Sequence, residues 1–99
     1  MKIRWNDNTT RWFQEASEYT GYNRILSKLL MEQIPHRGTL CDIGCGAALI
    51  DYEFAKEFEQ VTCVDVSQEA IDFVNKIIDT NHISNSTTNT LHRYDIYSW

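Results

Sequence analysis

Acidic residues and glycines are closely spaced in the middle of the chain. Asp42 stands near the end of an apolar run, Gly44 and Gly46 follow it, and Asp65 ends a second apolar run one helix later. Because glycine has no Cβ, the backbone can turn tightly there and a ligand can lie against it. A carboxylate at the end of the second run can accept hydrogen bonds from two ribose hydroxyls. This spacing predicts a nucleoside-binding unit of strand, helix and strand.

Asp42 indicates which nucleoside would bind. A dinucleotide loop presents its N–H groups to a pyrophosphate, and a carboxylate beside them would repel that anion. S-adenosylmethionine has no phosphate, and Asp42 can pair with the ammonium of its methionine portion, directly or through water. The third position of the dinucleotide fingerprint also falls on Leu49 instead of glycine or alanine. The residues therefore favour S-adenosylmethionine over a dinucleotide.

Two motifs carry a resemblance to a known family. They are Leu40-Cys41-Asp42-Ile43-Gly44-Cys45-Gly46 and Val64-Asp65-Val66-Ser67, and a weaker third is His92-Arg93-Tyr94-Asp95-Ile96. In these motifs the chain resembles the N-terminal part of class I, Rossmann-like, S-adenosylmethionine-dependent methyltransferases. The family often has a third glycine where this chain has Ala48, a change that could narrow the floor of the pocket.

The resemblance assigns roles to single residues. Gly44 and Gly46 would seat the methionine portion, Asp42 would bind its ammonium, and Asp65 would bind the ribose. Asp95 would lie near the adenine amino group. The predicted cofactor-binding residues are Asp42, Gly44, Cys45, Gly46, Asp65, Val66, Asp95 and Ile96.

Some of these assignments have structural alternatives. Asp65 could instead cap the helix that follows it, and Asp95 could be an ordinary surface acid. Val66 and Ile96 could flank the adenine or belong to the core. No catalytic residue can be assigned, and no metal site is expected because further ligands do not cluster at suitable spacing.

Apolar periodicity and breaker residues predict the elements that would position the site. The expected helices span about 10–19, 23–34, 48–59 and 67–80, the expected strands 39–43, 61–66 and 90–94, and residues 81–88 are expected to form a loop. Alternating strands and helices predict an α/β fold with a parallel sheet and right-handed crossovers. The resemblance implies a three-layer Rossmann-like α/β/α fold with a truncated sheet in the order 3-2-1, preceded by N-terminal helices.

Length and composition limit the other possibilities. The chain has 99 residues, which we interpret as a single, incomplete domain (1–99) that includes an N-terminal helical segment (1–36). A net charge of −5 argues against a general nucleic-acid binder. The absence of a long apolar run or a signal-like N-terminus leads us to expect a cytoplasmic protein with no membrane contact. Cys41 and Cys63 are expected to be core residues, and Trp12 and Phe13 are expected to pack the first helix onto the domain.

The function predicted from the sequence is methyl transfer from S-adenosylmethionine to an acceptor that the sequence does not name, a small molecule being favoured. The alternatives are a non-catalytic S-adenosylmethionine-binding module that acts through a partner chain, a fragment that binds nothing, and a dinucleotide-dependent oxidoreductase, which Asp42 and Leu49 disfavour. The resemblance implies that a fourth strand would pair with the first. Without it, the edge of the first strand would be open to self-association, unless the chain is part of a longer product.

Overall fold

A computed structural model of the protein describes residues 6–91. The elements in chain order are α1 (Asp7–Thr20), α2 (Tyr22–Gln33), β1 (Thr39–Ile43), α3 (Leu49–Phe54), β2 (Gln60–Asp65), α4 (Gln68–Thr80) and β3 (Ser86–Thr90).

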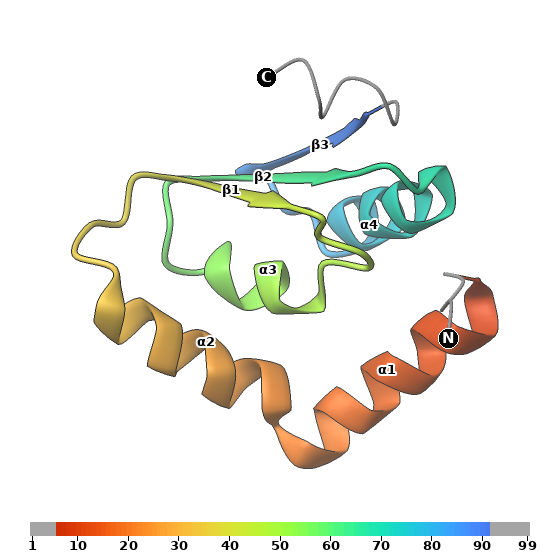
Figure 1. The fold of residues 1–99 in the computed structure, drawn as a ribbon, viewed down its shortest axis with the longest axis horizontal. Helices are drawn as coiled ribbons and strands as arrows, with labels where there is room; N and C mark the ends of the chain where they lie inside the picture. The colour runs from red at the N-terminus through yellow and green to blue at the C-terminus, as the bar shows by residue number, and fades with distance from the viewer. Residues whose placement is uncertain (1–5, 92–99) are drawn as a thin grey trace.

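The three strands form a parallel sheet with the spatial order β1-β2-β3, which confirms the order predicted from the sequence. Leu40 pairs with Val61, and Val61 pairs with Ser86. Figure 1 shows all four helices on one side of this sheet. The described residues therefore supply the sheet and one helical layer of the expected α/β architecture.

The hydrophobic core lies between the sheet and α3 and α4. Its members are Ala48, Phe54, Phe58, Val61, Cys63 and Val74. The rings of Phe54 and Phe58 meet edge to face, with their centroids 5.8 Å apart. This arrangement is favourable for aromatic pairs, and it holds the segment between α3 and β2 against the core.

Local side-chain chemistry sets the ends of the helices. The Asn6 side chain accepts hydrogen bonds from the N–H groups of Asn8 and Thr9, so α1 begins at Asp7 instead of near Thr10 as predicted. Gly21 has a φ of +68° and joins α1 to α2, as its breaker role predicts. The Ser67 hydroxyl accepts a hydrogen bond from the Ala70 N–H and caps α4, which confirms the predicted cap.

Two further predicted boundaries are wrong. The helix after the glycine loop ends at Phe54 instead of near Glu59, because the Glu59 N–H donates to the Arg37 and Gly38 carbonyls and the chain turns back toward β2. β3 begins at Ser86, inside the stretch expected to be a loop. Part of the strand expected at 90–94 lies outside the described residues.

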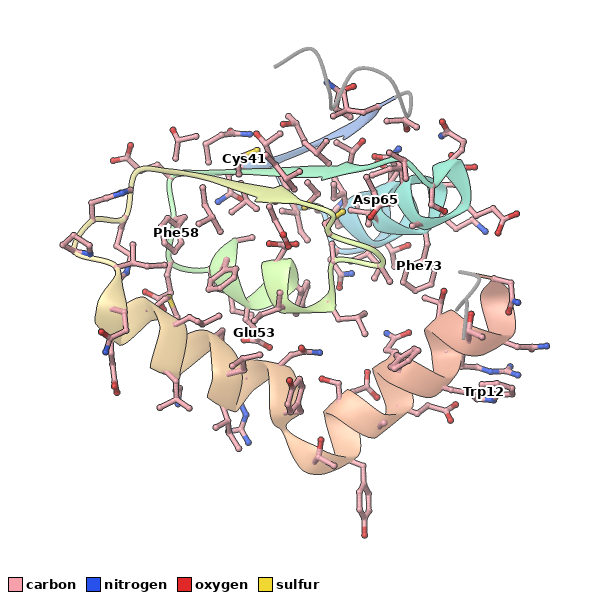
Figure 2. All side chains as sticks on the ribbon, viewed as in Figure 1. Trp12, Cys41, Glu53, Phe58, Asp65 and Phe73 are labelled. Atoms are coloured by element: carbon pink, nitrogen blue, oxygen red, sulfur yellow. The ribbon has the colours of Figure 1, made fainter. Side chains whose placement is uncertain are left out.

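The far face of the sheet has no helix over it among residues 6–91. Cys41 and Ile43 are exposed on this face, so the prediction that Cys41 is a core residue is wrong (Figure 2). Cys63 is buried on the helical face, as predicted. Trp12 is 62% exposed and Phe13 44% exposed, which contradicts their expected packing onto the domain.

Among the described residues, no helix is both long enough and apolar enough to cross a membrane.

Candidate functional site

The loop between β1 and α3 is fixed against the end of β2. The N–H groups of Gly44 and Cys45 both donate to the Val64 carbonyl, at 2.7 and 3.0 Å. Gly44 has a φ of +80° and Gly46 a φ of +57°, conformations that favour glycine because it has no Cβ. The two glycines are therefore needed for the shape of this loop.

Asp65 connects the end of β2 to the same loop. One carboxylate oxygen accepts a hydrogen bond from the Gly46 N–H and the other from the Ser67 N–H, both at 2.8 Å. Figure 2 shows Asp65 at the end of β2 that meets the glycine loop. Each carboxylate oxygen can accept more than one hydrogen bond, so Asp65 retains capacity for ribose hydroxyls.

Ala48 closes the glycine loop and starts α3. It has a φ of +53°, a left-handed conformation that favours glycine, and it stands at the position where the family that the chain resembles often has glycine. The Ala48 side chain is 7% exposed and belongs to the core. An L-residue in this conformation costs roughly 1–2 kcal/mol, and α3 therefore begins at a strained residue.

Asp42 lies on the helical face of β1, next to Cys63 in the register of the sheet. From α3, the side chain of Asp51 interacts with both of them. Asp51 is 3% exposed, and neither of its carboxyl oxygens has a hydrogen-bond partner. Burial raises the pKa of Asp51 from 3.8 to about 9, with further contributions from Asp42 and Cys45, so this carboxyl is protonated at neutral pH.

Two cysteines complete this cluster below the loop. Cys45 is half-buried and Cys63 is 1% exposed. A hydrogen bond with Cys45, followed by burial, raises the pKa of the Cys63 thiol, so Cys63 stays protonated. No group of three or more His, Cys, Asp or Glu residues within 6–91 is arranged to hold a metal ion.

An open cavity of about 570 Å³ lies between the corner of α1 and α2 and the glycine loop. It is lined by Phe13, Ala16, Ser17, Thr20, Tyr22, Asn23, Cys45, Ala47, Ala48, Leu49 and Ile50. Of the predicted cofactor residues only Cys45 is among them. The loop therefore borders the cavity through Cys45, Ala47 and Ala48 and is bonded to Asp65 through Gly46.

The structure brings most of the predicted site residues to one place. Asp42, Gly44, Cys45, Gly46 and Asp65 lie together where β1 and β2 end.

The remaining predicted residues have other outcomes. Val66 follows β2 and is 51% exposed, so the alternative that it belongs to the core is wrong. Asp95 and Ile96 lie outside the described residues.

Sequence reasoning missed Asp51. Its spacing contained a signal, because Ala48, Asp51 and Phe54 recur every three residues and share the buried face of the helix. A carboxylate in such a stripe is unusual, since buried acids are rare unless they are paired.

Comparisons with solved structures found several methyltransferases that share this fold. A SAM-dependent methyltransferase from Aquifex aeolicus superposes with a TM-score of 0.71 at 13% identity, over 90% of this chain and 48% of that chain. PKMT2 from Rickettsia typhi in complex with AdoHcy gives 0.54 at 29% identity, over 61% and 12%. The PRMT1 enzyme-prozyme complex of Trypanosoma brucei with AdoHcy gives 0.59 at 20% identity, over 83% and 26%.

A family model gives the assignment. The chain belongs to the methyltransferase small domain family, whose model matches residues 23–98. The chain spans less than half the length of each of the three solved structures. A search of the curated proteins found no match to this chain.

Proposed function

We propose that this protein binds S-adenosylmethionine and transfers its methyl group to a small-molecule acceptor. The observation that carries the proposal is the hydrogen bond from the Gly46 N–H to Asp65, which joins the glycine loop to the acidic end of β2. Membership of the methyltransferase small domain family supports the same reaction.

The residues at this end of the sheet fit the cofactor. Apart from Gly44 and its two chain neighbours, no heavy atom lies within 4 Å of the position that a Cβ on Gly44 would take, so the loop leaves open space for a ligand beside its backbone. Asp65 offers hydrogen-bond acceptors to a ribose, and Asp42 offers a carboxylate to an ammonium. The cofactor itself supplies an electrophilic methyl group on a sulfonium.

The protein's contribution is then to align the reactants and exclude water. The cavity of about 570 Å³ beside the loop is lined mainly by apolar side chains, including Phe13, Leu49 and Ile50. An acceptor held there would lie next to the glycine loop. Together with the net charge of −5, the size of this cavity favours a small acceptor over a nucleic acid.

Calorimetric titration with S-adenosylhomocysteine tests this proposal, with Gly44→Ala as the test variant. A methyl group on Gly44 would occupy the space left for the ligand, so we expect at least a tenfold loss of affinity. It would also strain a residue with positive φ, at a cost of roughly 1–2 kcal/mol of stability.

Gly21→Ala is the matched control, because Gly21 also has positive φ but joins α1 to α2. Its added methyl would meet only the flexible side chain of Arg24. We expect a similar loss of stability with unchanged affinity. A wild-type chain that is folded and does not bind, or two variants that lose affinity equally, would contradict the proposal.

One observation favours a second candidate function, a cofactor-binding module that acts with a partner chain. Within residues 6–91, the outer edge of β1 has no strand partner and the far face of the sheet carries no helix. Such an edge readily pairs with another chain. Saturable binding without turnover by the chain alone, and turnover once a partner chain is added, would favour this module.

A further inference from the structure

Asp51 has no place in the cofactor site described so far, yet it lies directly below it. Its side chain borders the same small cavity as Cys63, which pairs with Asp42 in the register of the sheet, and it interacts electrostatically with Asp42. Burying a polar group without a hydrogen bond costs about 1–3 kcal/mol in proteins. An apolar residue at this position of the core would avoid that cost, so Asp51 calls for an explanation beyond packing.

The surroundings of Asp51 exclude direct contact with a bound cofactor. Asp51 does not line the 570 Å³ cavity. It borders a separate cavity of only about 20 Å³, whose wall on the α4 side is formed by Val74, Ile77 and Ile78. That space has room for about one water molecule and for no larger ligand. Any effect of Asp51 on the cofactor must therefore pass through a neighbouring residue.

Asp42 is the neighbour through which Asp51 can act. The titratable groups that interact with Asp51 are Asp42 from β1, Cys45 from the glycine loop and Cys63 from β2. Asp42 is partly exposed at the end of β1, where the cofactor's ammonium is predicted to bind. A neutral carboxylic acid next to a carboxylate can donate its proton in a short, charge-assisted hydrogen bond.

We propose that Asp51 is a positioning residue whose carboxyl group donates a hydrogen bond to one oxygen of Asp42, so that the other oxygen faces the ammonium of the cofactor. This inference rests on the proposed binding of S-adenosylmethionine. The hydrogen bond would satisfy the buried carboxyl and hold Asp42 in one orientation. The pair would carry a single negative charge, which matches the single positive charge of the ammonium.

Two substitutions of similar size separate this role from a structural one. Asp51→Asn keeps a hydrogen-bond donor and Asp51→Leu removes it, while both fill the space in the core. We expect Asp51→Asn to bind S-adenosylhomocysteine within about threefold of wild type and Asp51→Leu to bind at least tenfold more weakly. Circular dichroism should show that both variants fold, since leucine suits the buried position.

The results distinguish failure of this inference from failure of the proposed function. If wild type binds and Asp51→Leu binds equally well, Asp51 is structural and the inference is wrong. If Asp51→Asn is as weak as Asp51→Leu, donation to Asp42 is wrong. If wild type does not bind, the proposed function fails.

A second readout needs no ligand. The carboxyl ¹³C resonance of Asp51 at pH 7 should report a protonated acid. An ionised Asp51 at that pH would overturn the inference whether or not the cofactor binds.

Discussion

Three carboxylates at the end of the sheet have different environments and therefore different chemistry. Asp65 is partly exposed and accepts two backbone hydrogen bonds, from the Gly46 and Ser67 N–H groups. Asp51 is buried without a partner and keeps its proton. Asp42, on β1, is partly exposed and therefore less buried than Asp51. The arrangement places two partly exposed carboxyl groups beside the glycine loop and a buried, neutral one among the core residues.

Asp51 makes stability depend on pH in the direction opposite to ordinary acid denaturation. Its pKa is about 9 in the folded protein and 3.8 ordinarily, so the folded state binds the additional proton between these values. Its contribution to stability is therefore largest below about pH 4 and is lost as the pH rises toward 9. The slope is at most about 1.4 kcal/mol per pH unit.

Urea unfolding at pH 6 and pH 8 measures this effect. Between these values we expect the wild type to lose about 2 kcal/mol more stability than Asp51→Asn, which has no proton to release at this position. Equal pH dependence in the two proteins would show that Asp51 is already ionised in the folded state.

At the scale of elements, the junction between the glycine loop and α3 concentrates backbone strain. Ala48 has a left-handed conformation, while the preceding Ala47 does not and is 1% exposed. Glycine at Ala48 would relieve roughly 1–2 kcal/mol of strain, but it would lose about 0.8 kcal/mol for one buried methyl and roughly 0.5–1 kcal/mol of chain entropy. These contributions nearly cancel.

Comparing Ala48→Gly with Ala47→Gly measures the free-energy cost of the positive φ at Ala48. Both substitutions remove one buried methyl group, but only the first relieves a positive φ. We expect Ala48→Gly to unfold within about 1 kcal/mol of wild type and Ala47→Gly to be less stable than Ala48→Gly by about 1–2 kcal/mol. Equal stabilities of the two variants, measured by denaturant unfolding, would mean that Ala48 is not strained.

Local signals predicted the elements whose ends are set by a single residue. A glycine after an apolar helical stretch often ends the helix, and a serine before one often caps it. Gly21 ends α1 and Ser67 caps α4 in this way. The start of β3 was predicted four residues too late because its sequence, Ser-Thr-Thr-Asn-Thr, is as polar as a loop. Its hydroxyls find partners only after folding, since Thr87 contacts Gln60 and Thr88 contacts Asn75.

Which side chains are buried depends on tertiary packing, which the sequence pattern did not reveal at every position. The apolar pattern of β1 does not show which face of the sheet the helices cover, so Cys41 was placed in the core although it is exposed. The spacing of Asp42, the glycines and Asp65 did predict that they meet, because strand ends in a parallel sheet share one edge. The environment of Asp51 depends on packing from α3, β1 and β2 together.

At the scale of the whole molecule, the described residues form an α/β arrangement compatible with a truncated Rossmann-like fold. Its helices cover one face of the sheet, and its glycine loop lies at the ends of β1 and β2 (Figure 1). The outer edge of β1 has no strand partner among residues 6–91. Self-association through that edge stays a prediction, as does a cytoplasmic location.

The central claim is that S-adenosylmethionine binds where β1 and β2 end, and amide NMR during titration with S-adenosylhomocysteine tests it most directly. The Gly46 and Ser67 amides both donate to Asp65, so their signals should shift in a saturable way. The Thr39 and Gln60 amides, at the opposite ends of the strands, should remain unchanged. Shifts confined to that opposite end, or no shifts in a folded chain, would contradict the account.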